Sequence, residues 1–243
     1  MGLKRLDKLI ALNCNVSRKE ARQLIKDSAV TLNGRVCLRA EELIDVENDE
    51  ISVEGYNFTL KEHVYIMMNK PKGVITATRD PQKETVIDII PPGLKRRSLF
   101  PAGRLDRDTT GLLLITDDGA FSHRIMSPAH HVYKTYIATL SYPLYEEDVK
   151  RLQSGIVLDD GTECLPAKVR PLEENGLPCA EIKIREGKYH QVKRMFAAVG
   201  NHVEQLRRVQ IGMLRLDADL AEGECRELTE DELTAVFSDE SDL

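Results

Sequence analysis

The sequence lacks the patterns that identify membrane and secreted proteins. Its 243 residues contain no apolar run near the roughly 18 residues that a membrane-spanning helix needs. The apolar stretch at residues 9–12 is too short for the core of a signal peptide. Position 6 is Leu, where an N-myristoylation signal has Ser or Thr. We therefore expect a cytoplasmic protein with no membrane partner.

Patterns typical of metal and nucleotide cofactors are missing as well. The five cysteines are odd in number and scattered, and none forms a C-x-x-C pair. This argues against both a disulfide framework and a zinc site. The chain also has no G-x-G-x-x-G, P-loop or H-E-x-x-H motif, so three common enzyme classes lack support. We expect no metal and no cofactor.

The acidic net charge of −6 conceals two basic segments. Residues 1–39 carry nine Lys or Arg against three acids, and residues 183–216 carry eight against two. Residues 217–243 hold eleven acids and a single Arg, which makes the total negative. Two separate basic segments are consistent with a two-point contact to nucleic-acid phosphates. A charge run is also typical of an ordinary solvated face.

The first 58 residues predict a small α/β domain. Leu3, Leu6, Leu9 and Ile10 form an apolar stripe at helical spacing. A capping box, Ser17 to Glu20, opens a second helix that ends near residue 27. Asn33-Gly34 then predicts a type I′ hairpin between residues 30 and 36. The second helix presents four basic side chains: Arg18, Lys19, Arg22 and Lys26.

Residues 63–232 predict a second, larger domain, after a boundary near residues 56–62. Strand patterns occur at 64–68, 112–115, 132–140, 180–185 and 203–216. Helices are expected at 120–126, 146–153 and 190–199, and a capping box at Thr229 opens a last short helix. We expect an α+β fold with a mixed, largely antiparallel sheet and flanking helices. Residues 233–243 would form a short acidic tail.

Four carboxylates cluster in the stretch GRLDRDTTGLLLITDDG, residues 103–119. Asp117 and Asp118 follow a buried strand and precede Gly119, which a turn and a helix cap explain. Asp106 and Asp108 lie on a loop hinged by glycines, where catalytic groups are often found. A pair of carboxylates could also serve a glycosidase. The spacing does not choose between Asp106 and Asp108.

Four motifs, taken in order, resemble those of the RsuA/RluA family of pseudouridine synthases. The first is Asn69–Val74, and the second is Gly103-Arg-Leu-Asp106 followed by Thr109–Leu113. The third is Lys134-Thr-Tyr136, and the last is Glu186–Met195 (EGKYHQVKRM). Residues 3–38 are similar to an S4 RNA-binding domain, the usual N-terminal partner in the RsuA branch. The resemblance covers about residues 3–232.

The resemblance implies isomerisation of a uridine in RNA to pseudouridine, with no cofactor. It makes Asp106 the catalytic aspartate, and a carboxylate is suited to act as nucleophile or base at a sugar carbon. Tyr136 would stack on the target base and carry a proton to or from C5. Lys193 would be the cation beside the carboxylate, where most relatives outside this branch have Arg. Asp108 matches no catalytic position of the family.

The same resemblance assigns RNA contacts. A uridine must be extruded from its stack before any group can reach its sugar, and Arg104 is similar to the arginine that fills the vacated space. Lys70 and Lys72 would contact phosphates. His190 and Gln191 would hold RNA or orient their helix. The basic helix of the first domain would grip structured RNA through its backbone and shape.

The resemblance to the RsuA branch implies 16S rRNA as substrate, with uridine 516 as the expected target. Large-subunit synthases of this branch often end in a basic tail, whereas this chain ends in an acidic one. The partner would be free 16S rRNA or a partly assembled small subunit, bound by a monomer. Three alternatives stay open: a 23S rRNA synthase, a non-catalytic ribosome-associated RNA-binding protein, and a glycosidase with a second essential acid.

Overall fold

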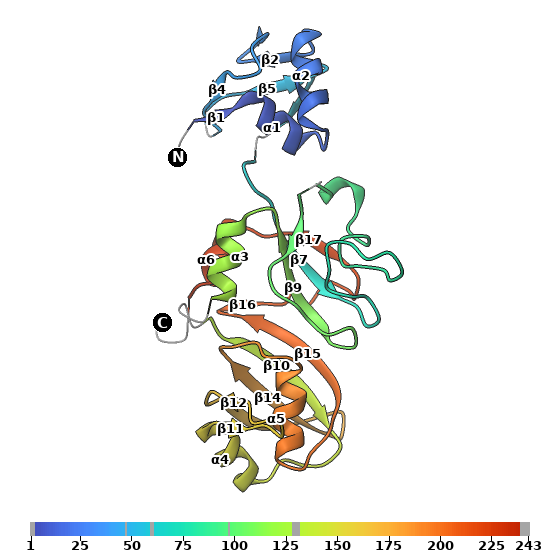
Figure 1. Ribbon diagram of the computed structural model, residues 1–243, viewed down its shortest axis with the longest axis vertical. Coiled ribbons are helices and arrows are strands. Elements are labelled where there is room, and N and C mark those ends of the chain that lie inside the picture. Colours follow the sequence, from blue (N-terminus) through green and yellow to red (C-terminus); the bar gives the residue numbers. More distant parts are fainter. Residues whose placement is uncertain (1–2, 47, 59–60, 97, 128–131, 239–243) are drawn as a thin grey trace. The chain divides into compact units, whose positions relative to one another are not determined.

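The computed structural model describes residues 3–46, 48–58, 61–96, 98–127 and 132–238 (Figure 1). The chain divides into two compact units. The first unit contains Met1–Val64 and Pro92–Leu99, and the second contains Tyr65–Pro91 and Phe100–Leu243. In the described part of the chain, no helix has the length and apolar character that crossing a membrane requires.

The first unit packs two helices against a small antiparallel sheet. Its elements are β1 (Lys4–Arg5), α1 (Leu6–Asn13), α2 (Arg18–Lys26), β2 (Val30–Leu32), β3 (Arg35–Val36), β4 (Leu43–Ile44), β5 (Ile51–Val53), β6 (Tyr56–Phe58) and the 3₁₀ turn η1 (Pro92–Leu94). Four strands form one sheet in the order β3-β2-β5-β6, and β1 pairs with β4. Leu6, Ile10 and Ile25 are buried in the core between helices and sheet.

Local sequence signals determine much of this unit. The Ser17 side chain accepts the Glu20 amide, and the Glu20 carboxylate accepts the Ser17 amide, so the predicted capping box is confirmed. Asn33 and Gly34 both have positive φ, at 49° and 77°, as the predicted type I′ turn requires. The first helix starts at Leu6, not Leu3, because residues 4–5 extend to pair with β4.

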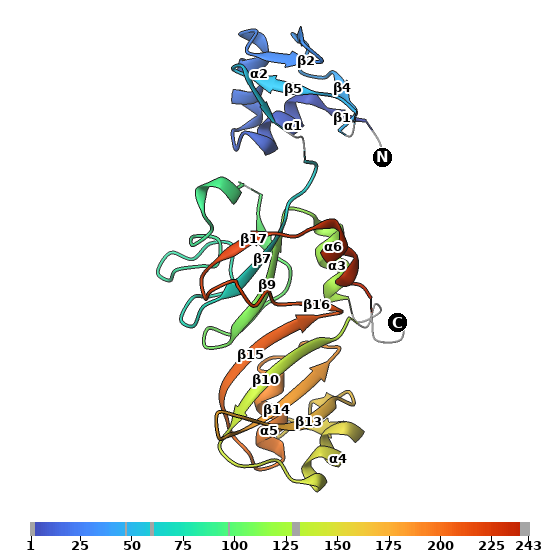
Figure 2. The ribbon, with the colours of Figure 1, turned by 180° about the vertical axis from the view of Figure 1, so that it is seen from behind.

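In its described residues, the second unit is built on a nine-stranded sheet with four helices. Its elements are β7 (Tyr65–Lys70), β8 (Phe100–Pro101), β9 (Thr110–Thr116), α3 (Gly119–Met126), β10 (Lys134–Leu140), α4 (Glu146–Ser154), β11 (Ile156–Val157), β12 (Glu163–Cys164), β13 (Lys168–Glu174), β14 (Leu177–Ile184), α5 (Gln191–Ala198), β15 (Val203–Ile211), β16 (Leu214–Arg215), β17 (Cys225–Glu227) and α6 (Glu230–Ala235). The two views show α4 and α5 on one face of strands β10, β14 and β15 (Figures 1 and 2).

The strand order confirms the predicted fold class. The main path is β13-β14-β10-β15-β9-β7-β17, with β16 beside β15 and β8 beside β9. Among the described strands of this sheet, β9 and β15 pair in parallel and every other pair is antiparallel. The fold is therefore α+β with a mixed, largely antiparallel sheet.

The parallel pair brings together two stretches that are almost 100 residues apart in sequence. Thr110 lies opposite Arg207, and Gly111 lies opposite Arg208. Gly111 has a φ of 98°, and a Cβ there would come within 2.2 Å of the Arg208 carbonyl oxygen. Only glycine allows this approach. The loop that precedes β9, with Asp106 on it, is thereby held next to β15.

The sequence prediction did not include the short strands β8, β11, β12 and β17, and it differs from the structure in two further features. Strand β13 was not predicted from the sequence, because this edge strand is polar, contains Pro171 and buries little more than Val169. The predicted acidic tail does not begin at residue 233. Residues 233–237 pack against the core around Phe121, with Val236 fully buried, and residues 239–243 lie outside the described part.

Candidate active site

The loop between β8 and β9 carries Asp106 and is hydrogen-bonded to the segment that follows β7. The Thr76 hydroxyl donates to the Leu105 carbonyl at 2.7 Å and accepts the Leu105 amide at 3.2 Å. The Arg107 Nε donates to the Gly73 carbonyl at 2.8 Å, and the Gly73 amide donates back to the Arg107 carbonyl at 2.8 Å. The first sequence motif therefore supports the aspartate loop.

Lys70 stabilises the same loop through buried hydrogen bonds. This corrects the prediction that Lys70 contacts a phosphate. Strand β7 continues through Lys70, and its side chain is completely buried. Its ammonium donates to the carbonyls of Pro71, Arg107 and Thr109 at 3.0, 3.4 and 3.0 Å. Burial lowers the pKa of Lys70 to about 8. A cation in this position holds the loop and cannot contact RNA.

A cleft of about 550 Å³ opens beside the loop. One wall comes from the loop, with Arg104, Asp106 and Arg107. The opposite wall comes from Gly187–Gln191, which lead from β14 into α5. Tyr136 on β10 and Leu206 on β15 also line the cleft. It is large enough for a nucleoside, since small-molecule sites begin near 300 Å³.

Asp106 lies in this cleft with two basic side chains nearby. Its carboxylate is 31% exposed. His190 Nε2 is 3.6 Å from Asp106 Oδ1, and Lys193 Nζ is 3.9 Å from Asp106 Oδ2. Both basic residues come from the start of α5, so the loop and the helix jointly place the carboxylate.

Lys193 makes a shorter contact with Asp108. Its Nζ is 2.6 Å from Asp108 Oδ1, and this hydrogen bond lowers the pKa of Asp108. Asp108 is 58% exposed and does not line the main cleft. Its carboxylate belongs to a smaller neighbouring hollow that also contains Lys72. The structure therefore gives the two aspartates of the loop different surroundings.

Asp118, from the second pair of carboxylates, has a structural position. Asp118 caps α3 by accepting the amides of Ala120 and Phe121 at 2.9 and 3.1 Å. It also accepts the Tyr65 hydroxyl at 2.9 Å. The cap predicted for Asp118 is therefore confirmed. In the described part of the chain, no cluster of three or more His, Cys, Asp or Glu side chains is arranged to hold a metal ion.

Tyr136 contacts a buried arginine that the sequence analysis missed. Tyr136 is almost fully buried, and its hydroxyl accepts a long hydrogen bond of 3.5 Å from Arg208 Nη1. Arg208 is also buried, and its Nε donates to the Leu112 carbonyl at 2.7 Å. Its Nη2 is buried without a hydrogen-bond partner among the described residues. The sequence signal for a buried Arg208 was a charged residue at an inward-facing position of a strand in which buried and exposed residues alternate.

The remaining predicted contacts in this unit fall into two groups. Arg104, Lys72 and His190 each lie on a cavity wall, where RNA could reach them. Gln191 is buried, and its amide donates to Glu186 Oε1 at 2.7 Å while its oxygen accepts the Lys188 amide at 2.9 Å. Both polar ends are thus used within the protein. Gln191 shapes the wall of the cleft, so of its two predicted roles the structure favours orienting the helix and disfavours an RNA contact.

In the first unit, a buried aspartate organises part of the basic surface. Asp7 accepts hydrogen bonds from Arg5, Arg18 and Arg22 at 2.9–3.2 Å. Burial opposes its charge, but the three guanidinium groups outweigh burial and lower the pKa of Asp7 to about 2. Lys19 and Lys26 are exposed on α2. The predicted basic helix therefore has two arginines held by Asp7 and two outward lysines.

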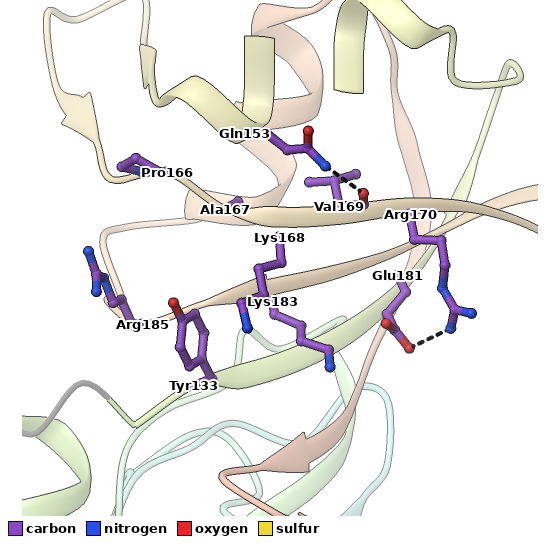
Figure 3. Close-up of a pocket in the computed structure, with 10 residues that line it drawn as sticks. All are labelled: Tyr133, Gln153, Pro166, Ala167, Lys168, Val169, Arg170, Glu181, Lys183 and Arg185. Atoms are coloured by element: carbon purple, nitrogen blue, oxygen red, sulfur yellow. Dashed lines mark hydrogen bonds and ion pairs between the residues drawn. The ribbon is translucent and has the colours of Figure 1, made fainter. Parts of the chain in front are cut away.

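A second hollow, of about 450 Å³, lies on the other face of β14 (Figure 3). Ile184 lines the cleft, whereas its neighbours Lys183 and Arg185 line this hollow, because successive strand residues face opposite sides. An ion pair of 3.2 Å joins Arg170 to Glu181 there. The sheet separates this hollow from Asp106, so the candidate chemistry is in the first cleft.

Comparisons with known proteins agree with this site. Residues 64–198 match the family described as RNA pseudouridylate synthase, and residues 4–51 match the S4 domain. An uncharacterised RNA pseudouridine synthase of Bacillus subtilis is 44% identical, over 94% of this chain and 96% of its own. Ribosomal small subunit pseudouridine synthase A of Escherichia coli is also 44% identical, over 96% and 99%.

Similarity to a solved structure extends over the same length. The crystal structure of a pseudouridylate synthase is 42% identical, covers 96% of this chain and 99% of its own, and has a TM-score of 0.66. The fold, the cleft and these matches define an RNA-modifying isomerase. The chain belongs to the RNA pseudouridylate synthase family, and its S4 domain and full-length similarity place it in the RsuA branch.

Proposed function

We propose that this protein isomerises uridine to pseudouridine in 16S rRNA, at uridine 516, as a cytoplasmic monomer. One observation carries the proposal: Asp106 lines a nucleoside-sized cleft that Tyr136 on β10 also lines, and the basic side chains of His190 and Lys193 at the start of α5 lie 3.6 and 3.9 Å from its carboxylate. The 16S assignment is supported by the E. coli relative, whose name specifies the small subunit and whose length this chain matches almost completely.

In the proposed reaction, the N1–C1′ bond of uridine breaks and a C5–C1′ bond forms. A proton leaves C5 and one is taken up at N1, so neither an oxidant nor water is consumed. Asp106 starts the reaction as nucleophile or base, and Lys193 and His190 lie beside its carboxylate. Tyr136 stacks on the uracil ring, and Arg208 holds the Tyr136 hydroxyl.

Arg104 and the S4 unit complete the proposal. The target base has to leave its stack, and Arg104, exposed on the wall of the cleft, occupies the space it vacates. Lys72 contacts a phosphate near the cleft. Lys19 and Lys26 on α2, with Arg18 and Arg22 oriented by Asp7, bind the RNA backbone. Such contacts position the RNA and contribute affinity that falls with salt.

The test uses 16S rRNA incubated with the wild-type protein, Asp106→Asn and Asp108→Asn. Carbodiimide modification followed by primer extension locates pseudouridine. We expect one new site with wild type and with Asp108→Asn, and none with Asp106→Asn, which should still bind the RNA. Free 16S rRNA and small-subunit particles lacking the modification are compared as substrates.

Each alternative gives a different result. A pseudouridine site in 23S rRNA and none in 16S rRNA would contradict the proposal that 16S rRNA is the substrate. Binding without modification of either rRNA would favour a non-catalytic binding protein. Free uracil as a product, with activity lost in both aspartate variants, would indicate a glycosidase with a carboxylate pair.

A further inference from the structure

Tyr189 is an exposed aromatic residue at the mouth of the cleft with no role in the chemistry described above. Its side chain is 75% exposed, and it lines the cleft that contains Asp106. A large exposed aromatic ring beside a site for RNA differs from a scattered surface apolar residue, because RNA bases stack on such rings.

The ring has a defined orientation. It stacks on the imidazole of His190, with ring centroids 3.9 Å apart and an interplanar angle of 18°. One face of Tyr189 is therefore covered, and its high exposure comes from the other face and the edge. The main chain is also held, because Arg194 Nη1 donates to the Tyr189 carbonyl at 3.3 Å.

His190 connects this ring to the catalytic carboxylate. It has a left-handed backbone, with φ 47° and ψ 34°, directly before α5. Its Nε2 is 3.6 Å from Asp106 Oδ1. Gln191 fixes the preceding loop through Glu186 and the Lys188 amide. The position of the Tyr189 ring relative to Asp106 is therefore set by the protein before RNA binds.

We infer that Tyr189, supported by His190, is a stacking platform for the nucleobase next to the target uridine. This inference rests on the proposed function. Extrusion of the uridine disrupts the stacking of its neighbours. Arg104 occupies the vacated space in the stack, and the open face of Tyr189 receives the neighbouring base that lies at the mouth of the cleft. Tyr189 is thus a positioning residue that binds RNA and does not take part in bond-making.

The test uses the RNA fragment in which mapping places the pseudouridine, with 2-aminopurine substituted on either side of the target. Single-turnover reactions give the half-saturating protein concentration and the limiting rate separately. We expect Tyr189→Leu to raise the half-saturating concentration about 5- to 100-fold, as loss of one base–aromatic stack does, and to change the limiting rate less. Tyr189→Phe should stay within about twofold of wild type, because the ring is kept.

Fluorescence identifies the stacked base directly. One of the two 2-aminopurine probes should be quenched by wild type and by Tyr189→Phe, and should stay bright with Tyr189→Leu. The chain contains no tryptophan, so Tyr189→Trp adds a single reporter whose emission should fall when RNA binds. The matched control is Tyr142→Leu, which removes a 63% exposed tyrosine that does not line the cleft.

The outcomes separate this inference from the proposed function. If wild type forms pseudouridine and Tyr189→Leu matches it in both half-saturating concentration and quenching, the inferred stacking role of Tyr189 is wrong. If wild type forms no pseudouridine in any rRNA, the proposed function is wrong, whatever the fluorescence shows. Misfolding is checked by circular dichroism, and a failure of Tyr189→Phe to restore binding would also contradict the platform.

Discussion

The ammonium of Lys193 is hydrogen-bonded to Asp108 at 2.6 Å. Its distance to the Asp106 carboxylate is 3.9 Å, so the cation lies nearer to the aspartate outside the cleft. We expect Asp108→Asn to retain activity within about tenfold, because Lys193 keeps its charge and a surface ion pair contributes little. Lys193→Met should lose about 100-fold or more in kcat, since electrostatic stabilisers in active sites have effects of that size. Steady-state kinetics on the mapped RNA would show this, and equal losses in the two variants would contradict it.

Lys70 should act on catalysis through the position of the Asp106 loop. Lys70→Met leaves three carbonyls without their common donor. We expect kcat to fall about 100-fold, the scale of a 1 Å misplacement of a reacting group. Lys72→Met is the matched control, because Lys72 is exposed two residues further on. It should leave kcat unchanged and weaken RNA binding with a smaller salt dependence. Equal behaviour of the two variants would contradict the positioning role.

Arg208 should act through the Tyr136 hydroxyl. We expect Arg208→Lys to lower kcat about tenfold, because lysine keeps the charge but cannot span both Leu112 and Tyr136 as the guanidinium does. In a double-mutant cycle, Arg208→Lys should have little further effect in a Tyr136→Phe background. Arg207→Lys, at the exposed neighbouring position, is the control. Fully additive losses would show that Arg208 works independently of the hydroxyl.

Asp7 should make the first unit sensitive to acid. Asp7→Asn removes the acceptor of three arginines and should lower the free energy of unfolding by about 2 kcal/mol at neutral pH. Because the pKa of Asp7 is about 2, below the roughly 3.9 of an unfolded aspartate, this stabilisation is complete above about pH 4 and is lost as the pH falls toward 2. Urea unfolding between pH 3 and 7 measures the difference. The control variant is Asp27→Asn, which changes an exposed aspartate at the C-terminal end of α2.

Features governed by neighbouring residues could be predicted from the sequence. The capping boxes at Ser17 and Thr229 and the turn at Asn33-Gly34 depend on side chains within a few residues, and the structure confirms all three. The fold class followed from strand and helix periodicity, which reports burial. The resemblance to the family came from short motifs that keep their order along the chain.

What the sequence could not provide depends on contacts between distant residues. In the sequence, Lys70 resembles a surface lysine. Its ammonium binds carbonyls of the loop before β9, and these belong to residues 37 and 39 positions further along the chain. Arg208 meets Tyr136 across 72 residues, and Gln191 is buried by the loop folding back on it. No local pattern distinguishes Lys70 and Gln191 from solvated side chains, and for Arg208 the local signal is only its inward position on an alternating strand. Whether a polar residue binds RNA or holds the protein is decided by tertiary packing.

The parallel pairing of β9 with β15 has a consequence for the newly made chain. The first unit is complete once Leu99 has been synthesised, but Asp106 has no opposite wall until α5 and β15 follow, about 100 residues later. At an elongation rate of about 5–20 residues per second this delay is on the order of 5–20 s. During that interval the nascent polypeptide contains its whole RNA-binding unit but only part of the cleft around Asp106.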